Sequence, residues 1–229
     1  MNIKSEVYVM KRIIPVILIL MLLIAGSAIS ASAAEDGWVF QVATGSGYSF
    51  TTPLTIKQDG QPDIKVDAEY KTKAWATMAP YYDLRVGKWK NGRAWEFESH
   101  HHKLHLSNGP SEVQKFVISH GYNLNTVNYA WQGTAWDMIY RVGGGFVMTH
   151  PETIIRNQRY EDEGGLNGFH ISGVTVQAGA EKRFRINEAF FFYLEGKLTA
   201  SYAVIPVANG EATVPNAALH GLFGIGYIY

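Results

Sequence analysis

From Trp38 to the C-terminus, hydrophobic and polar residues alternate with a period of two, and no apolar stripe recurs at the 3.6-residue period of a helix. In the segment 190–202 every second residue is apolar or glycine, while the residues between them include Glu195 and Lys197. Such alternation predicts β-strands with one apolar and one polar face, and hence an all-β fold. The same pattern recurs in three further segments, 136–148, 174–183 and 219–229.

Turn signals separate these segments. Asn91-Gly92 is a strong signal for a two-residue β-hairpin, and Arg185–Glu188 is a second tight connection. Longer polar connections are expected at 51–62, 151–169 and 206–215. Short turns that alternate with long polar loops are typical of outer-membrane barrels, whose short turns face the periplasm.

The spacing of turns and alternating segments gives nine candidate strands: 38–50, 63–77, 81–90, 93–105, 113–121, 135–149, 171–184, 189–205 and 216–229. Bacterial single-chain barrels have an even number of strands. We therefore expect eight, either because 63–90 is one strand bent at Pro80 or because 113–121 is an extension of a loop.

The later strands carry an apolar face about 9–11 residues long, which is the length that a tilted strand needs to cross a bilayer. Aromatic residues lie at the strand ends, as in the interfacial girdles of membrane barrels. The chain ends at Tyr229 inside an alternating apolar strand, and this ending resembles the C-terminal strand of Gram-negative outer-membrane proteins, which their assembly machinery recognises. We predict an antiparallel transmembrane β-barrel in the outer membrane rather than a soluble barrel, whose two faces would have the opposite polarity.

The first segment is expected to be a signal peptide. Lys11 and Arg12 precede the short apolar run Ile13–Ala25, and small residues follow up to Ala34. An apolar run of this length is too short for the ~30 Å hydrocarbon core, although an N-terminal membrane anchor is the alternative. Residues 1–34 are thus assigned to the signal peptide and residues 35–229 to a single barrel domain, which we expect to be a monomer.

Composition and charge exclude several classes of protein. Lys and Arg number 20 and Asp and Glu number 20, so the chain lacks the basic excess of a nucleic-acid binder. There is no cysteine, which excludes disulfides and thiol chemistry. The polar faces of the strands place charges of both signs in the lumen, where they must pair, so a general porin is disfavoured and a small-solute channel ranks last. The expected interior charges are Asp67, Glu69, Asp83, Arg85, Glu96, Glu98, Asp137, Arg141, Glu181, Arg183, Glu195 and Lys197.

The most unusual stretch is 95–109, which holds four of the eight histidines. Alternation places His100 and His102 on one strand face with glutamates. Imidazole and carboxylate are zinc ligands, but alternate residues of one strand rarely surround an ion alone. We therefore expect a polar strand end at the membrane rim, with no metal and no cofactor, and leave a metal at His100 and His102 as an alternative.

The sequence His105-Leu106-Ser107-Asn108 resembles the H-x-S-N motif of the outer-membrane lipid A deacylases, which are eight-stranded barrels. The resemblance implies that His105 is a general base and Ser107 a nucleophile, with Asn108 near the oxyanion. Residues i and i+2 of a strand point to one face, so the imidazole could take the hydroxyl proton. The nearest carboxylate is Glu112, although the family has its motif closer to the C-terminus and its orienting Glu farther along the chain.

The sequence therefore predicts a small outer-membrane barrel of structural or lipopolysaccharide-binding type without an open pore. A lipid A-modifying hydrolase acting at the outer leaflet is the alternative. The expected partners are outer-membrane lipids and lipopolysaccharide, whose phosphates suit Arg156 and Arg159.

Overall fold

The computed structural model describes residues 36–74, 80–134, 136–161 and 168–229, and all of these lie in one compact unit, Ala31–Tyr229. The predicted signal peptide lies outside the described residues. No helix in the described part of the chain is long and apolar enough to span a membrane. The described residues form one antiparallel sheet of strands β1 (Gly37–Ser49), β2 (Thr52–Gln58), β3 (Ile64–Ala68), β4 (Tyr70–Lys71), β5 (Tyr82–Lys90), β6 (Arg93–Leu106), β7 (Val113–Gln132), β8 (Met138–Thr149), β9 (Glu152–Ile155), β10 (Gln158–Glu161), β11 (His170–Arg185), β12 (Phe190–Val207) and β13 (Gly210–Ile228).

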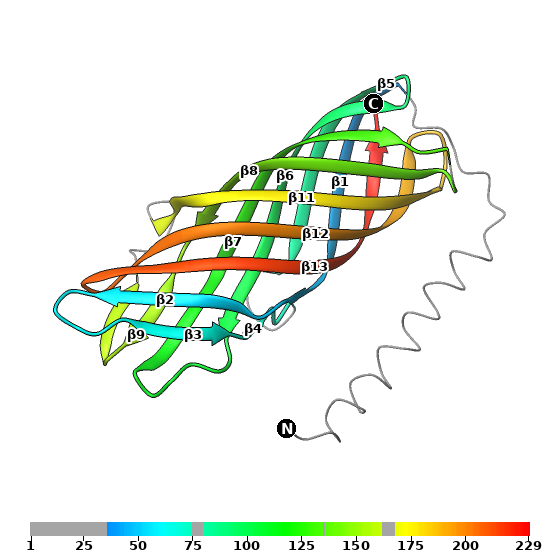
Figure 1. The fold of residues 1–229 in the computed structure, drawn as a ribbon. Helices are drawn as coiled ribbons and strands as arrows, with labels where there is room; N and C mark the ends of the chain where they lie inside the picture. Colours follow the sequence, from blue (N-terminus) through cyan, green and yellow to red (C-terminus); the bar gives the residue numbers. More distant parts are fainter. Residues whose placement is uncertain (1–35, 75–79, 135, 162–167) are drawn as a thin grey trace, which may run out of the picture. The chain divides into compact units, whose positions relative to one another are not determined.

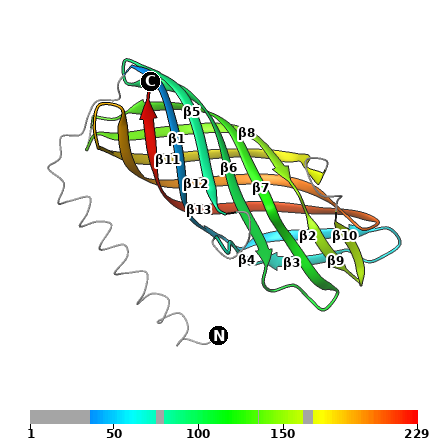
Figure 2. The same cartoon turned by 180° about the vertical axis from the view of Figure 1, so that it is seen from behind.

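Eight of these strands close into a ring. Its order is β1-β5-β6-β7-β8-β11-β12-β13, and β13 pairs again with β1 through the register Phe40 to Tyr227 (Figure 1). The prediction of an eight-stranded antiparallel barrel is confirmed. The remaining strands β2, β3, β4, β9 and β10 extend the wall at one end of the ring (Figure 2).

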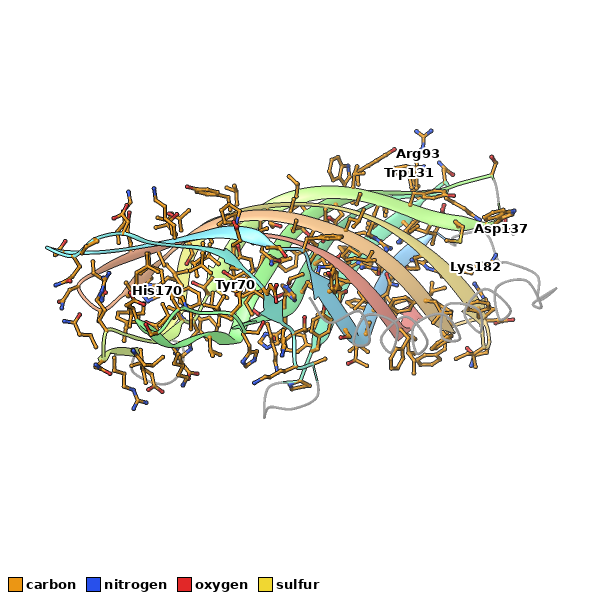
Figure 3. The ribbon with its side chains drawn as sticks, turned by 60° about the horizontal axis from the view of Figure 1, so that its bottom comes forward. Tyr70, Arg93, Trp131, Asp137, His170 and Lys182 are labelled. Atoms are coloured by element: carbon orange, nitrogen blue, oxygen red, sulfur yellow. The ribbon has the colours of Figure 1, made fainter. Side chains whose placement is uncertain are left out.

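The two ends of the barrel differ in the length of their connections. Asn91 and Gly92 have φ of +52° and +69° and form the tight β5–β6 turn, as their sequence predicts. This turn lies at the same end as Trp131, Asp137 and Lys182, opposite the end that holds Tyr70 and His170 (Figure 3). The short-turn end is the periplasmic end and the long strands of the other end are extracellular.

The outer face of the ring is an apolar band. The predicted outward rows are confirmed on β12 and β13, where Leu198 is 53% exposed and Phe223 46% exposed. The predicted outward rows of β8 and β11 are also confirmed, with Phe146 and Val174 exposed. Exposing large apolar side chains to lipid costs little free energy, whereas exposing them to water is unfavourable.

The polarity of the interior reverses along the barrel. In the ring the interior holds the buried charges beside a small apolar cluster that includes Trp89, Phe191 and Tyr193, whereas the extracellular extension encloses a larger core that is apolar throughout. The reversal follows the solvent, because a wall that faces lipid is apolar outside, and a wall that faces water places its apolar residues inside. The extracellular core includes Leu54, Ile56, Leu104, Phe116, Ile118, Tyr122, Ile155, Ile205, Val207 and Val214.

Two strand predictions were wrong. The segment 113–121 is the first half of the twenty-residue strand β7, and the segment 63–77 lies off the ring, where β3 and β4 contribute to the extension. β7 was missed beyond residue 121 because Asn123, Asn125 and Asn128, of which only Asn128 faces the lumen, belong to a type that is rare in strands. The expected loops 51–62 and 151–169 also contain the strands β2, β9 and β10.

Candidate functional site

The lumen of the ring is filled by ion pairs between buried side chains. Arg85 contacts Glu98, Glu181 and Glu195 at 2.9, 3.1 and 2.8 Å. Arg141 contacts Glu96 and Glu181 at 3.0 and 2.8 Å. The carboxylates Asp83, Glu96, Glu98, Glu181 and Glu195 are joined to the cations Arg85, Arg141, Arg183 and Lys197, so the joined groups number five anions and four cations.

Lys197 binds two of these carboxylates. Its Nζ atom lies 2.7 Å from Asp83 Oδ2 and also contacts Glu98 Oε1, and all three side chains are fully buried. Charges removed from water must be paired in this way. The predicted interior charges are confirmed at these positions, whereas Asp67, Glu69 and Asp137 were wrongly assigned to the lumen and are exposed. Asp137 lies in the β7–β8 turn, and Asp67 and Glu69 lie on the extension, where the polar face points to water.

A layer of aromatic and imidazole rings separates the ion pairs from the apolar extracellular core. His100, on β6, places Nδ1 2.9 Å from Asp83 Oδ2 and Nε2 3.0 Å from the Tyr81 hydroxyl. The hydroxyl also contacts Nδ1 of His220, on β13. His102 Nε2 lies 3.2 Å from Ser49 Oγ. The sequence predicted that His100 and His102 share a face, and both are buried, but it did not identify Tyr81 or His220 as their neighbours.

His105 lies near the end of β6, and Ser107 and Glu112 lie in the β6–β7 connection beyond it, where the Glu112 carbonyl oxygen accepts from Arg156 N in the β9–β10 turn. The Ser107 hydroxyl donates to the Glu69 carbonyl oxygen at 3.0 Å. Glu112 Oε2 accepts a hydrogen bond from the Ser111 hydroxyl at 3.0 Å. Among the described residues, no hydrogen bond joins His105 to either Ser107 or Glu112, and His105 Nε2 is buried without a hydrogen-bond partner.

His105 is surrounded by cations. Burial, followed by the positive charges of Lys73 and Lys103, lowers the pKa of His105 to about 4, although Glu152 opposes this effect. Its imidazole is therefore neutral at pH 7, the form in which it can accept a proton. The pKa of Glu112 is lowered by hydrogen bonds to its own backbone and to Ser111, so this exposed carboxylate is ionised.

Three of the lysines around His105 form a basic patch on the outer wall, which we define as Lys71, Lys73 and Lys115. Lys71 pairs with His105 in the β4–β6 ladder, and Lys115 binds Glu152 at 2.5 Å. Lys71 and Lys73 are exposed, whereas Lys103 is fully buried. Lys71 and Lys73 line one recess together with Tyr48, an exposed aromatic residue on β1.

No family model and no curated protein matches the sequence. Three solved structures resemble the fold: Ail, the attachment invasion locus protein of Yersinia pestis, is 12% identical with a TM-score of 0.39 and covers 85% of this chain and 100% of its own. Neisserial surface protein A is 8% identical with a TM-score of 0.40, covering 84% of this chain and 96% of its own. The outer membrane protein AlkL is 12% identical with a TM-score of 0.44, covering 89% and 94%.

The features of the chain itself decide its class. A closed ring of eight antiparallel strands has no free edge, an apolar band faces outward, and the lumen is polar. Closed barrels with this polarity satisfy every backbone hydrogen bond within lipid and are the spanning structures of outer membranes. The chain is a small outer-membrane β-barrel.

Proposed function

We propose that this chain is a closed barrel that binds lipopolysaccharide on its outer wall and conducts no solute through its lumen. The observation that carries the proposal is the basic patch beside the apolar band. Lysine ammonium groups bind phosphate as point charges, and phosphate groups of lipid A lie at the depth where this patch meets the lipid surface. An acyl chain of the same lipid would then lie along the apolar band.

The closed lumen is supported by two successive barriers. Below, the ion pairs of Arg85, Arg141 and Lys197 fill the ring. Above, the extracellular core holds Ile56, Ile205 and other fully buried apolar side chains. A hydrated solute would have to break the ion pairs and also cross an apolar core. In planar bilayers we expect no stepwise conductance, and regular single-channel steps from the purified barrel would contradict this part of the proposal.

Binding is tested with the detergent-refolded barrel and lipopolysaccharide. Replacing Lys71 and Lys73 by glutamine should weaken binding by about 2–10-fold, as expected for the loss of two exposed charge pairs, and should reduce the dependence of the affinity on salt. A matched control replaces Lys57 and Lys65, two exposed lysines on β2 and β3 that lie outside the patch. Equal losses in both double variants, or no loss in either, would contradict binding at the patch.

The second candidate function is hydrolysis of a lipid A ester at the same patch. It is favoured by the neutral imidazole of His105, whose Nε2 is buried without a hydrogen-bond partner. In this reaction His105 would take the proton of the Ser107 hydroxyl, which must first leave the Glu69 carbonyl oxygen. Mass spectrometry of lipid A after incubation with the barrel should show loss of an acyl chain that the Ser107→Ala variant does not produce. Unchanged lipid A with the wild type would exclude the hydrolase and leave the binding function standing.

A further inference from the structure

Three polar atoms from distant parts of the chain converge inside the barrel. Nε2 of His100 and Nδ1 of His220 lie 3.3 Å apart, and the Tyr81 hydroxyl oxygen contacts both nitrogens. All three side chains are buried to within 1% of full burial. They come from β6, from β13 and from the residue that precedes β5, so the convergence is a product of the fold.

The outer nitrogen of each ring has its own partner. Nδ1 of His100 lies 2.9 Å from Asp83 Oδ2, and because a carboxylate only accepts, this nitrogen carries the proton. With its proton on Nδ1, the imidazole of His100 turns the lone pair of Nε2 toward His220. Nε2 of His220 lies 2.8 Å from the Thr199 hydroxyl, which allows His220 to donate there and to turn its Nδ1 lone pair toward His100. A carboxylate or hydroxyl behind a ligating histidine is the usual arrangement around a protein-bound metal.

The separation of the two nitrogens matches a metal ion. In a tetrahedral zinc site with bonds of about 2.0–2.1 Å, two ligand atoms are about 3.3–3.4 Å apart. The 3.3 Å between His100 Nε2 and His220 Nδ1 agrees with this value. With this pair of tautomers both lone pairs face the same point, and the single Tyr81 hydroxyl proton can satisfy only one of them.

The charge of the lumen favours a cation at the same place. The ion-paired groups comprise five carboxylates and four cations, which leaves one negative charge in excess. Asp83 is a member of this set and contacts His100 directly. A cation held by His100 would therefore lie next to a network that lacks one positive charge, and its burial would be partly compensated.

A glycine keeps the space beside these atoms open. A Cβ atom at Gly47 would lie 2.9 Å from His220 Nδ1 and 3.0 Å from the Tyr81 hydroxyl oxygen, closer than such atoms normally approach. Gly47 also lines a recess of about 480 Å³ in the outer wall, together with Ser49, Tyr70 and Ser107. The recess and the three atoms thus meet at a residue without a side chain, which gives an ion a route from the surface.

A neighbouring group is a weaker candidate. Ligand atoms of Asp83, Glu98 and His100 also lie within 4.8 Å of one another. Lys197, however, contacts both carboxylates and already supplies their positive charge. A metal there would have to displace a buried ammonium group.

We propose that His100, His220 and Tyr81 form a binding site for a divalent metal ion of the zinc class, with Asp83 and Thr199 as positioning residues for the two imidazoles. The site goes beyond the proposed function and differs from the expectation from sequence, which placed no metal in the chain and considered only His100 with His102. Its effect is structural, because the ion would hold β6 and β13 to the segment before β5. This is the level at which β5 begins to pair with its neighbours β1 and β6.

The test measures zinc uptake by the full barrel, purified without a histidine tag, stripped with EDTA and dialysed against zinc chloride. We expect about one zinc ion per barrel by elemental mass spectrometry. His220→Gln and Tyr81→Phe should lose most of this uptake, and Thr199→Val should bind about 10–100-fold more weakly. His170→Gln, a substitution in β11 at the extracellular end, is the matched control and should bind as the wild type does.

Folding of each variant is checked by its shift in gel migration before and after boiling, and Tyr81→Phe preserves the test should His220→Gln not fold. Cobalt provides a second measurement, because a site with imidazole and phenol ligands gives the ion visible absorption that the folded variants should lack. A folded wild-type barrel that takes up no zinc would overturn the proposal, and so would equal uptake by Tyr81→Phe and His220→Gln.

Discussion

Replacing Lys197 by methionine should strongly destabilise the barrel, although the two side chains have similar size. Lys197 Nζ lies 2.7 Å from Asp83 and also contacts Glu98. All three side chains have no exposed surface, so water cannot replace the lost ammonium group. The substitution would change the ion-paired set from five anions and four cations to five anions and three cations.

The cost follows from the uncompensated charge. Removing one partner of a buried ion pair typically costs about 3–5 kcal/mol, because the other partner remains buried without compensation. A second substitution, Glu98→Gln, removes one carboxylate. The double variant then has four anions and three cations, so the excess of one anion is the same as in the wild type. The double variant Lys197→Met/Glu98→Gln should therefore recover a large part of the loss, although each substitution alone destabilises the barrel.

The assay is urea unfolding of the barrel in lipid vesicles, followed by tryptophan fluorescence, with a free energy of unfolding for each variant. Lys90→Met, at the exposed end of β5, is the matched control and should change this free energy by less than about 1 kcal/mol. The reasoning would be refuted by a Lys197→Met barrel as stable as the control, or by a double variant that is less stable than Lys197→Met by the full cost of Glu98→Gln.

Three further predictions use the same unfolding assay. Ile205→Ala, in the extracellular core, should cost about 2–5 kcal/mol through the cavity it leaves, and a smaller loss would show that this core is loosely packed. Gly92→Ala should cost about 1–2 kcal/mol from its φ of +69° alone, since the nearest atom to the added Cβ is 3.7 Å away; an unchanged midpoint would contradict the turn geometry. The pKa of His105 is lowered to about 4, so the unfolded chain binds the proton more tightly: the contribution of His105 to stability is complete above about pH 6.5 and is lost as the pH falls toward 4. With partial screening by solvent the loss is about 1–2 kcal/mol, and the difference between wild type and His105→Gln should stay flat from pH 8 to 7 and shrink between pH 6.5 and 4.

The ring could be predicted from sequence because its outer and inner faces differ along every second residue. The alternation of Leu194, Leu198 and Tyr202 with Glu195 and Lys197 determines which side meets lipid, and the structure has these side chains on the expected sides. Turn chemistry at Asn91-Gly92 determined one register directly. Local signals of this kind act within one strand or one hairpin, and they need no knowledge of the partners across the barrel.

The extension and the buried ring layer could not be predicted in this way. The register between β6 and β7 shifts between His102 and Leu104, where β7 has two extra residues, so His105 has other neighbours on β7 than uninterrupted pairing would give it. The approach of Tyr81 and His220 joins positions 139 residues apart, and no local pattern in either segment indicates it. In the sequence these residues are isolated polar positions on separate strands, and nothing in the sequence indicates that they meet.

The reversal of polarity along the barrel limits where function can lie. Within the ring, the lumen is occupied by ion pairs around Arg85, and in the extension it is occupied by apolar side chains around Ile205. Neither region leaves its interior groups available to a large ligand, because binding would expose either unpaired charges or apolar surface to water. The outer wall carries no such penalty where the apolar band meets Lys71 and Lys73, since both the band and the ammonium groups are already exposed. A lipid with anionic headgroups satisfies both surfaces at once, which is why the proposed function lies on the outside of the barrel and the proposed metal site, needing only one ion, lies within it.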